Sequence, residues 1–424
     1  MEEDNTEVLR ACGRQRSRRP AADASSLQTE DKRQRTTPRK PRPIHRPWTL
    51  YAPPRSAEDP SVPLAASTFR FMSFNVLADY LVINDRENEP AKRHQKYDWE
   101  YRCGRLVKEI LRWSPHIVNL QEVDHFEDFF EPRLKKAGFV GVYKRRTGEK
   151  THDGCAIFVK KNMFRIVSSH PIEYHVPDHP VLDRDNIALT AVVEAKNSVG
   201  GRDPARFVVA NTHLLFNPNV RELAFRGEIK LAQLDMLLKH LTSLRQEHNL
   251  ILPVLLSGDF NLAPHSPLYH FLSTGKLDAS GLSRYGLSGQ NLDTNALRKA
   301  ARVNENDRTR HHGNGTAFGK FKSGRAQRND FRVYKPNTAY SHELDFASAY
   351  AQSPDDKCTG EPKFTIFHSG SKGTVDYIWY TRSSLHCHGV VEMIPAGLLF
   401  KHDELPTTEH SSDHLSLVAD FSLR

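Results

Sequence analysis

Short runs of hydrophobic residues, separated by polar turns, recur along the chain from residue 69 to the C-terminus. A run of four to eight apolar or alternating residues is typical of a β-strand that is buried on one or both faces. On this basis the sequence predicts strands at 69–78, 115–123, 154–161, 187–195, 206–215, 249–257, 374–382 and 414–421. Apolar residues at helical spacing predict two amphipathic helices, at 99–113 and 227–241. Strands that alternate with helices indicate an α/β domain.

Two parts of the sequence lack this pattern. Residues 1–67 include a basic, proline-rich segment with few large apolar residues, which predicts a disordered tail before a domain at 68–424. Residues 283–340 are polar and predict a long insertion or loop. The tail holds much of the basic excess behind the formal net charge of +9. Such an arm binds RNA, acts as a nuclear address or is simply solvated, and composition does not choose among these.

Composition argues against several classes of protein. No apolar run approaches the roughly 20 residues that cross a bilayer, and the acidic start "MEEDNTEVLR" does not resemble a secretory signal. The five cysteines are scattered and have no Cys-x-x-Cys spacing, which argues against a disulfide framework or a structural zinc site. We therefore expect a protein of the cytoplasm, the nucleus or both, with no membrane partner.

Polar side chains that are able to do chemistry stand at the ends of the predicted strands. Each alone has an ordinary explanation: asparagine caps turns, a lone histidine is usually structural, and Asp259 with Asn261 is also compatible with an Asx-type turn. Strand ends of a packed α/β domain converge on one edge of the sheets, so we expect these side chains to form one site. They are Asn75, Glu122, His213, Asp259, Asn261, Asp376, Asp413 and His414.

This set of side chains favours metal-dependent hydrolysis of a phosphoester. Carboxylate and amide oxygens are the ligands that Mg²⁺ prefers, and Mn²⁺ accepts the same ligands. The two histidines are able to donate to a phosphoryl oxygen, and a neighbouring carboxylate would keep one of them protonated. The sequence contains neither a nucleophile-elbow serine nor a Walker-type phosphate-binding loop. Attack of an activated water on phosphorus is the route that remains.

Six ordered motifs resemble the endonuclease–exonuclease–phosphatase superfamily: "SFNVLA", "LQEV", "NTHL", "SGDFN", "TVDYIW" and "SSDHLSL". The resemblance extends from about Phe69 to the C-terminus and implies the DNase-I-like fold of the α/β class, a four-layer sandwich of two sheets. Within the superfamily the chain is similar to the carbon catabolite repressor four, nocturnin and Angel group of deadenylase-like exonucleases. The stretches "LDRDNIALT", "NTHLLFNP" and "EHSSDHLSL" resemble the Angel branch most closely.

The resemblance implies a metal side and a water-activating group. Glu122 would be the principal Mg²⁺ ligand, with Asn75 beside it, and Asp413 would complete the metal side. Asp259 would orient or deprotonate the attacking water.

The resemblance also implies how the substrate is held. Asn261 would hold the scissile phosphate and His213 would contact a phosphoryl oxygen. Asp376 would pair with His414 and keep it charged. Further substrate contacts would come from Pro218 and Asn186.

Two features set the chain apart from the poly(A)-specific members of this group. Those members carry an aromatic ring that stacks on adenine five positions before the aspartate of the "DY" pair, and Ser371 stands there in this sequence. Loss of a stacked ring removes roughly 1–3 kcal/mol per base, so adenine preference is not implied. The sequence also has no leucine-rich repeat of the kind that tethers some members to a larger deadenylase complex, so membership of that complex is not implied either.

Four functions remain compatible with the sequence. The leading hypothesis is a Mg²⁺-dependent 3′–5′ exoribonuclease of the deadenylase kind, with the RNA 3′ end of an mRNA tail as substrate and a role in mRNA decay. The second keeps the site but makes the enzyme a phosphatase of terminal or 2′,3′-cyclic phosphates on RNA. The third is a phosphatase of a small dinucleotide or a lipid headgroup, activities that the superfamily also contains. The fourth is a non-catalytic RNA-binding scaffold that uses the basic tail.

Overall fold

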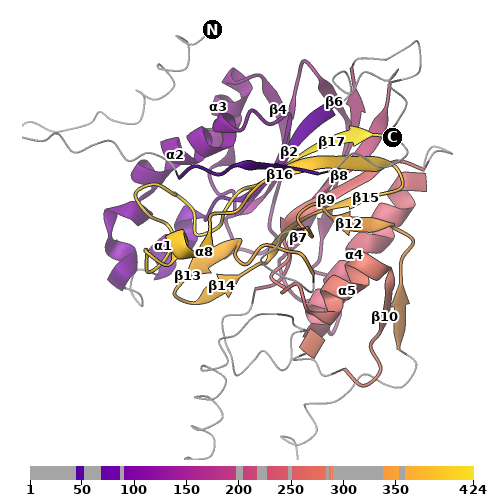
Figure 1. Cartoon of the computed structure of the whole chain (residues 1–424). Coiled ribbons are helices and arrows are strands. Elements are labelled where there is room, and N and C mark those ends of the chain that lie inside the picture. Colours follow the sequence, from indigo (N-terminus) through magenta and orange to yellow (C-terminus); the bar gives the residue numbers. More distant parts are fainter. Residues whose placement is uncertain are drawn as a thin grey trace, which may run out of the picture.

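The computed structural model describes residues 44–51, 68–85, 90–196, 204–216, 227–246, 251–282, 286–287, 289, 338–352 and 359–424. These residues form two mixed β-sheets that pack face to face, with helices against both outer faces (Figure 1). The arrangement is the predicted four-layer α/β sandwich.

The first sheet contains seven strands among the described residues, in the order β1-β16-β17-β2-β3-β5-β4. β2 and β3 are parallel, and the other neighbours are antiparallel. The strands are β1 Trp48–Leu50, β2 Thr68–Asn75, β3 Ile117–Gln121, β4 Phe139–Arg145, β5 Gly154–Lys160, β16 Leu385–Val391 and β17 Leu417–Leu423.

The second sheet contains six strands in the described part of the chain, in the order β12-β15-β9-β8-β7-β6. β8 and β9 are parallel, and the other neighbours are antiparallel. The strands are β6 Phe164–Glu173, β7 Ile187–Ala195, β8 Arg206–His213, β9 Val254–Asp259, β12 Phe346–Ser348 and β15 Asp376–Thr381. Two short strand pairs lie outside the sheets: β10 Lys276–Asp278 with β11 Ala339–Ser341, and β13 Ile366–His368 with β14 Ser371–Gly373.

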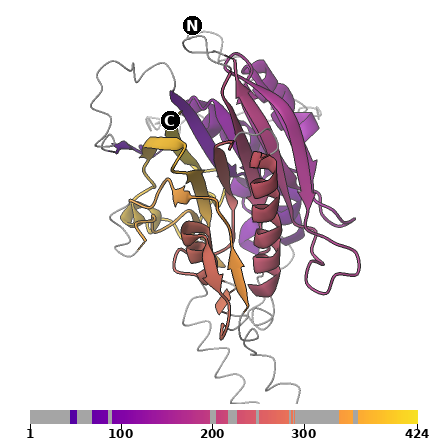
Figure 2. The same ribbon diagram turned by 90° about the vertical axis from the view of Figure 1, so that its right-hand side faces the viewer.

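Helices α2 Trp99–Arg112 and α3 Glu131–Lys136 pack their apolar faces on the outside of the first sheet. Helices α4 Gly227–Gln246 and α5 Pro267–Thr274 cover the outside of the second sheet, where α4 is seen along its length in Figure 2. The remaining helical segments are short: α1 Asp79–Asp85, α8 Ala396–Leu399, 3₁₀ turns at Pro90–Arg93 and Gln95–Tyr97, and a π turn at Phe126–Phe130. α2 and α4 confirm the two predicted amphipathic helices.

The space between the sheets is apolar over most of its length but becomes polar near the end where the parallel strands terminate. There the Nδ2 atom of Asn119 on β3 donates to the carbonyl oxygen of Ala210 and to Ser257 Oγ, both at 2.9 Å. Gln121 Nε2 donates to Asn211 Oδ1 at 2.7 Å, and Asn211 Nδ2 donates to two carbonyl oxygens of the first sheet at 2.8 and 2.9 Å. This inter-sheet polar layer fixes the separation and alignment of the strand ends, because every partner is buried and would be costly to leave unpaired.

The predicted tail contains a segment that belongs to the folded domain. Within residues 44–51, β1 pairs with β16, and the Arg46 side chain is buried. Arg46 Nε donates to the Glu392 carbonyl oxygen at 2.7 Å, and Nη1 donates to Ser416 Oγ at 2.9 Å. The local sequence did not indicate this order, because the partners of Arg46 lie more than 300 residues away. The rest of the predicted tail, 1–43 and 52–67, lies outside the described residues.

Most of the predicted insertion, 283–340, also lies outside the described residues. Its last residues, Ala339 and Tyr340, belong to β11 and pair with β10. This pairing brings the end of the insertion back to the chain that precedes it.

Each predicted strand overlaps an observed one, with boundaries that differ by a few residues. β17, for example, begins at Leu417 rather than at residue 414. The pattern did not indicate β4, β6 or β16, because polar side chains interrupt the apolar residues in "FVGVYKR", "FRIVSSHPIE" and "LHCHGVV". Three of the five cysteines fall in the described chain, where they are buried and form no disulfide with one another. Among the described helices, none combines the length and apolar character that a membrane span requires.

The inter-sheet polar layer gives a test of stability. We expect Asn211→Leu to lower the free energy of unfolding by about 2–4 kcal/mol. The change removes the shorter of the two hydrogen bonds of the Gln121 amide, which keeps a 3.2 Å bond to Ser73 Oγ, and it takes the side-chain donor away from two buried carbonyl oxygens. Urea unfolding followed by circular dichroism measures the difference. Asn162→Leu, at an exposed turn, is the control and should change the value by less than about 0.5 kcal/mol. Equal stability of the two variants would show that the layer does not hold the sheets together.

Candidate active site

The register of the second sheet brings three of the predicted site residues together. Asp259, the last residue of β9, pairs directly with His213 at the end of β8 and with Asp376 at the start of β15. β8 is parallel to β9, so the two strands end at the same edge, whereas β15 is antiparallel and begins there. The alternation of strand direction explains why site residues stand at both the ends and the starts of strands in the sequence.

One amide connects this edge to the first sheet. Asn75, the last residue of β2, donates from Nδ2 to Glu122 Oε1 at 2.9 Å and to Asp259 Oδ2 at 3.1 Å. The second Glu122 oxygen, Oε2, accepts a hydrogen bond from the backbone N–H of Ala78 at 3.0 Å. Two buried carboxylates from different sheets are therefore held on either side of a single side chain.

The backbone at the site adopts unusual conformations that aim these side chains. Glu122 and Asn261 have φ angles of 56° and 51°, in the left-handed region that costs non-glycine residues roughly 1–3 kcal/mol. The Asn261 N–H donates to Asp259 Oδ1 at 3.0 Å, so an Asx-type turn follows the strand while Oδ2 remains directed at Asn75. The buried Lys230 of α4 donates to the Asn261 carbonyl oxygen. At Gly258, a Cβ atom would lie 1.9 Å from the Thr212 oxygen, which explains the glycine of "SGD".

His414 is buried between two carboxylates. Its Nδ1 atom forms a 2.8 Å hydrogen bond with Asp376 Oδ2, and its Nε2 atom lies 3.7 Å from Asp259 Oδ2. Burial lowers the pKa of His414, but the Asp376 carboxylate more than offsets this effect, with help from Asp413 and Asp259, so the pKa lies well above its usual value. The predicted pairing of Asp376 with a cationic His414 is present in the structure.

His213 lies on the other side of Asp259 and behaves in the opposite way. Burial, reinforced by the positive charges of Arg146 and His414, lowers the pKa of His213 well below its usual value. Its Nε2 atom lies 3.6 Å from Asp259 Oδ2, and its Nδ1 atom has no hydrogen-bond partner among the described residues. The site thus combines a neutral imidazole with an imidazolium around one carboxylate.

The carboxylates themselves are difficult to ionise in this surrounding. Burial, followed by the negative charges of Asp413 and Asp153, raises the pKa of Glu122 to about 7. Burial, followed by the charge of Asp376, raises the pKa of Asp259 to about 8. A cation between Glu122 and Asp259 would balance the negative charge that the two carboxylates carry when they are ionised.

Comparison with known proteins identifies the domain. The model of the Endonuclease/Exonuclease/phosphatase family matches residues 72–414. The chain belongs to this family. Carbon catabolite repressor protein 4 homolog 3 of Arabidopsis thaliana is 33% identical over 84% of this chain and 75% of its own length. Protein angel homolog 2 of Homo sapiens is 32% identical over 84% of this chain and 69% of its own length.

Solved structures agree with the family assignment. The crystal structure of ANGEL2, a 2′,3′-cyclic phosphatase, in complex with adenosine-2′,3′-vanadate has a TM-score of 0.68 and 30% identity, covering 90% of this chain and 99% of that one. The human Nocturnin catalytic domain with a bound sulfate anion has a TM-score of 0.52 at 23% identity, covering 84% of this chain and 95% of that one, which is a likeness of fold. The predicted fold and superfamily are confirmed, and membership makes this domain a hydrolase of phosphoester bonds.

The residues of this endonuclease/exonuclease/phosphatase domain fit a divalent cation. Glu122, Asp259 and His414 offer ligand atoms that all lie within 4.8 Å of one another, and they are the one such group in the described part of the chain. A cationic His414 is not a ligand, so Glu122 is the group that would anchor the ion, with Asp259 next to it. Oxygen donors of this kind suit Mg²⁺ or Mn²⁺.

Some predicted members of the site take other positions. Asp413 is partly exposed and accepts a 3.4 Å hydrogen bond from Ser412, and it is not in the group of close ligand atoms, although its charge acts on Glu122. Asn186 is buried and donates to the His213 carbonyl oxygen at 3.1 Å while it accepts from Gln233, so its visible contacts position His213. Pro218 lies outside the described residues.

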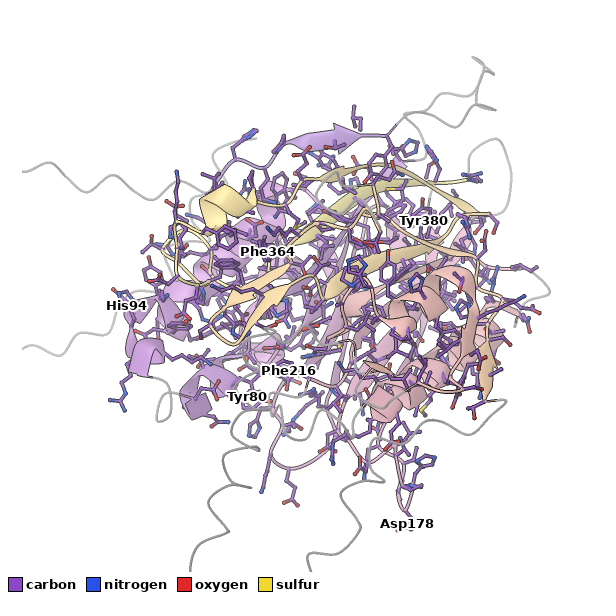
Figure 3. The ribbon with its side chains drawn as sticks, turned by 60° about the horizontal axis from the view of Figure 1, so that its bottom comes forward. Tyr80, His94, Asp178, Phe216, Phe364 and Tyr380 are labelled. Atoms are coloured by element: carbon purple, nitrogen blue, oxygen red, sulfur yellow. The ribbon has the colours of Figure 1, made fainter. Side chains whose placement is uncertain are left out.

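The strand-end pattern did not indicate three residues near the site: Asp153, Tyr80 and Arg146. Asp153 is buried immediately before β5, where it accepts a 2.7 Å hydrogen bond from Tyr80 Oη and lies 3.5 Å from Arg146 Nη1. Asp376 also stands at the start of a buried antiparallel strand. The same pattern is visible at Asp153 in the sequence "HDG" of residues 152–154. Tyr80 is labelled in Figure 3, which turns this edge of the sandwich toward the viewer.

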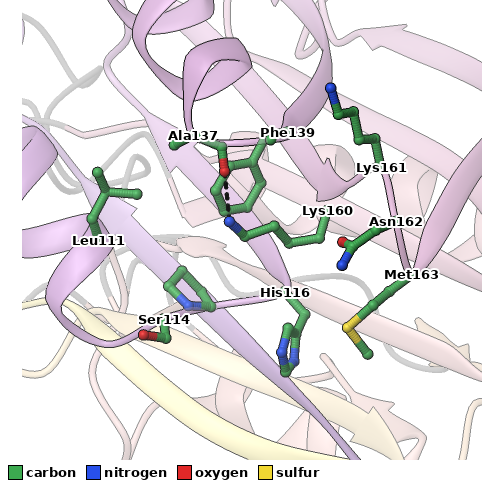
Figure 4. A pocket seen from close by; sticks show the side chains of 11 residues that line it. Leu111, Ser114, His116, Ala137, Phe139, Lys160, Lys161, Asn162 and Met163 are labelled. Atoms are coloured by element: carbon green, nitrogen blue, oxygen red, sulfur yellow. Dashed lines mark hydrogen bonds between the residues drawn. The ribbon is translucent and has the colours of Figure 1, made fainter. Parts of the chain in front are cut away.

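A cavity of about 480 Å³ lies at the opposite end of the first sheet, far from the site. Its lining includes His116 before β3 and Lys160 at the end of β5, whereas Glu122 and Asp153 stand at the other ends of these strands (Figure 4). Lys160 Nζ donates to the Ala137 carbonyl oxygen at 2.6 Å. This cavity is therefore not part of the hydrolytic site.

The metal assignment predicts a loss of binding and turnover together. We expect Glu122→Ala to abolish the rise in melting temperature that Mg²⁺ or Mn²⁺ gives the unchanged protein, and to lower turnover by about 100-fold or more. Differential scanning fluorimetry with and without the ion measures the first effect. Glu127→Ala, an exposed carboxylate five residues away, should behave like the unchanged chain. Metal-induced stabilisation that survives in Glu122→Ala would place the ion elsewhere.

The histidine pair predicts a shift of the pH profile. Asp376 raises the pKa values of both His414 and Asp259, so Asp376→Asn lowers both. If activity requires cationic His414 and ionised Asp259, the alkaline and acidic limbs of the kcat/KM profile both move to lower pH. Asp345→Asn, a partly exposed carboxylate that pairs with Arg382, is the control. An alkaline limb that stays in place would show that His414 does not act as a cation.

Proposed function

We propose that this domain is a divalent-metal-dependent phosphoesterase that acts on RNA 3′ ends and hydrolyses terminal 2′,3′-cyclic phosphates. The observation that carries the proposal is the buried Asp259, held between a cationic His414 and a neutral His213. Burial raises the pKa of Asp259 to about 8 when no cation is near it, so its ionised form is a stronger base toward water than an exposed carboxylate. A bound Mg²⁺ would supply charge neutralisation at the phosphate.

The chain's own residues support each part of this chemistry. Asp259 orients the water and accepts its proton as the oxygen attacks phosphorus. His414, charged and fixed by Asp376, stabilises the negative charge that develops on the phosphoryl oxygens. His213 offers a neutral imidazole, and Asn261 offers a side-chain amide whose contact with the Leu214 carbonyl oxygen, at 3.1 Å, fixes its orientation. Hydrolysis of the cyclic diester by this arrangement opens the ring and leaves a phosphate monoester.

The choice of a cyclic phosphate is supported by the comparison with ANGEL2. That 2′,3′-cyclic phosphatase is 30% identical, with nearly all of its chain covered by this one. Ser371 supports the same choice, because it occupies the place where the poly(A)-specific members carry a ring. It pairs with His368 in the β13–β14 hairpin and gives adenine no platform.

A 3′–5′ exoribonuclease of mRNA tails is the second candidate. It is favoured by the 33% identity to carbon catabolite repressor protein 4 homolog 3. The site residues would serve both reactions, because each is an attack of water on phosphorus. The two functions differ in the phosphoester bond that lies next to Asp259: a bond of the terminal cyclic phosphate in the first, and the bond between the last two nucleotides in the second.

An RNA assay with defined ends separates the candidates. The full chain is incubated with 5′-labelled RNAs that end in a 2′,3′-cyclic phosphate, a 3′-phosphate or a free hydroxyl, with Mg²⁺ or with a chelator. We expect the cyclic end to be opened only when Mg²⁺ is present, with the RNA length unchanged.

Asp259→Asn is the matched control and should retain RNA binding while losing turnover, because an amide cannot accept the proton of water. A ladder of shortened products from the RNA with a free hydroxyl would instead favour the exoribonuclease. No change in any RNA would favour the non-catalytic scaffold.

A further inference from the structure

A group of aromatic rings lies beside the site, outside the residues that carry the chemistry. Phe364 and Phe367 pack edge to face, and each contacts Phe400 with ring centroids 5.6 Å apart. Phe364 and Phe367 are buried, whereas Phe400, directly after α8, is 56% exposed. We refer to these three rings as the Phe400 platform. Its two inner rings hold the outer ring at the surface.

Two lysines lie against the rings of the platform. Lys363 Nζ lies 5.5 Å from the centroid of the Phe364 ring and 5.6 Å from that of Phe400. Lys372 Nζ lies 4.4 Å from the Phe367 centroid and donates to the Asp403 carbonyl oxygen at 3.2 Å. Both lysines are exposed. A ring with flanking cations differs from a purely apolar patch and is complementary to stacked bases joined by phosphates.

The platform is continuous with the active site through the backbone. The Phe367 N–H donates to the Asp413 carbonyl oxygen at 3.0 Å, and Ile366 forms a β-bridge with His414. The Leu415 N–H donates to the Thr365 carbonyl oxygen at 2.7 Å. The hairpin that carries Phe367 is therefore hydrogen-bonded along the segment that carries His414, and α8 lies beside it (Figure 1). The platform therefore lies against the chain segment that holds His414.

We propose that Phe400, Lys363 and Lys372 bind single-stranded RNA upstream of the 3′ end that occupies the site. The proposal rests on the proposed function, because it needs an RNA end at His414. Phe400 stacks on a base, and the lysines contact neighbouring phosphates. Since every base has a π face, the platform adds affinity without base preference. A protein partner is the less suitable occupant, because a single exposed ring is small compared with the apolar patches that mark protein interfaces.

Binding of an RNA of about 12 nucleotides tests the ring directly. Fluorescence anisotropy is measured with full-length chains that also carry Asp259→Asn, so that the RNA is not consumed. We expect Phe400→Ala to weaken binding by about 5- to 100-fold, and Phe400→Trp to retain it. Phe400→Leu keeps apolar contact with the inner rings but lacks a π face, so it should bind nearly as weakly as Phe400→Ala.

The lysines are tested through the salt dependence of the same binding. Lys363→Ala and Lys372→Ala should each reduce the slope of log affinity against log salt by about 0.7. Lys239→Ala, on the exposed face of α4, is the control and should leave the slope in place.

Substrate length distinguishes this proposal from the proposed function. With the unmodified Asp259, Phe400→Ala should lower kcat/KM for the oligomer at least about 5-fold more than for adenosine 2′,3′-cyclic phosphate, which has no upstream nucleotide. Equal losses for the two substrates, or oligomer binding that does not depend on Phe400, would overturn the platform. If the unchanged chain hydrolyses neither substrate while its RNA binding depends on Phe400, the platform stands and the proposed function fails.

Discussion

The active site depends on one buried amide that lies between two carboxylates from different sheets. Asn75 Nδ2 donates to both Glu122 and Asp259, and it is able to do so because the strand ends of the two sheets meet at a fixed distance. The inter-sheet polar layer immediately beneath sets that distance. Asn119 and Asn211 tie the sheets together by hydrogen bonds to groups that water cannot reach. A shift of one sheet relative to the other would break these bonds and separate the carboxylates. The stability of the sandwich and the geometry of the site therefore depend on the same hydrogen bonds.

Burial then decides the charge of each group in the site. Removal from water raises the pKa values of Glu122 and Asp259 and lowers that of His213, in each case by disfavouring the charged form. His414 is the exception, because its contact with Asp376 outweighs the cost of burial. The two histidines thereby differ in charge: His414 is cationic and His213 is neutral. Both lie next to the basic carboxylate of Asp259. Strained backbone at Glu122 is consistent with a position whose purpose is to direct a side chain.

The β13–β14 hairpin connects the chemistry to substrate selection. Its backbone pairs with the segment that carries His414, so the hairpin lies next to the site. Ser371 gives the hairpin no ring at the position where the poly(A)-specific members have one, while Phe367 supports the exposed Phe400 behind it. The exposed aromatic ring beside this hairpin is therefore Phe400 and not a ring at position 371. This difference agrees with the proposed reaction at the terminal phosphate and with the proposed binding of upstream nucleotides.

The sequence by itself determined the two amphipathic helices, the apolar strands of both sheets and most of the site, because buried strands are short apolar runs and their ends carry the polar residues. Asn75, Glu122, His213, Asp259, Asn261, Asp376 and His414 were all visible in this way. Only the tertiary structure showed that Arg46 belongs to the fold and that Asp153 belongs near the site, since the partners of both are remote in sequence. It also decided that Asn186 supports His213 and that Asp413 stands apart from the close ligand atoms. A residue type limits what a side chain is able to do, but burial and the register of distant strands fix its charge and its partners, and neither is encoded in local spacing.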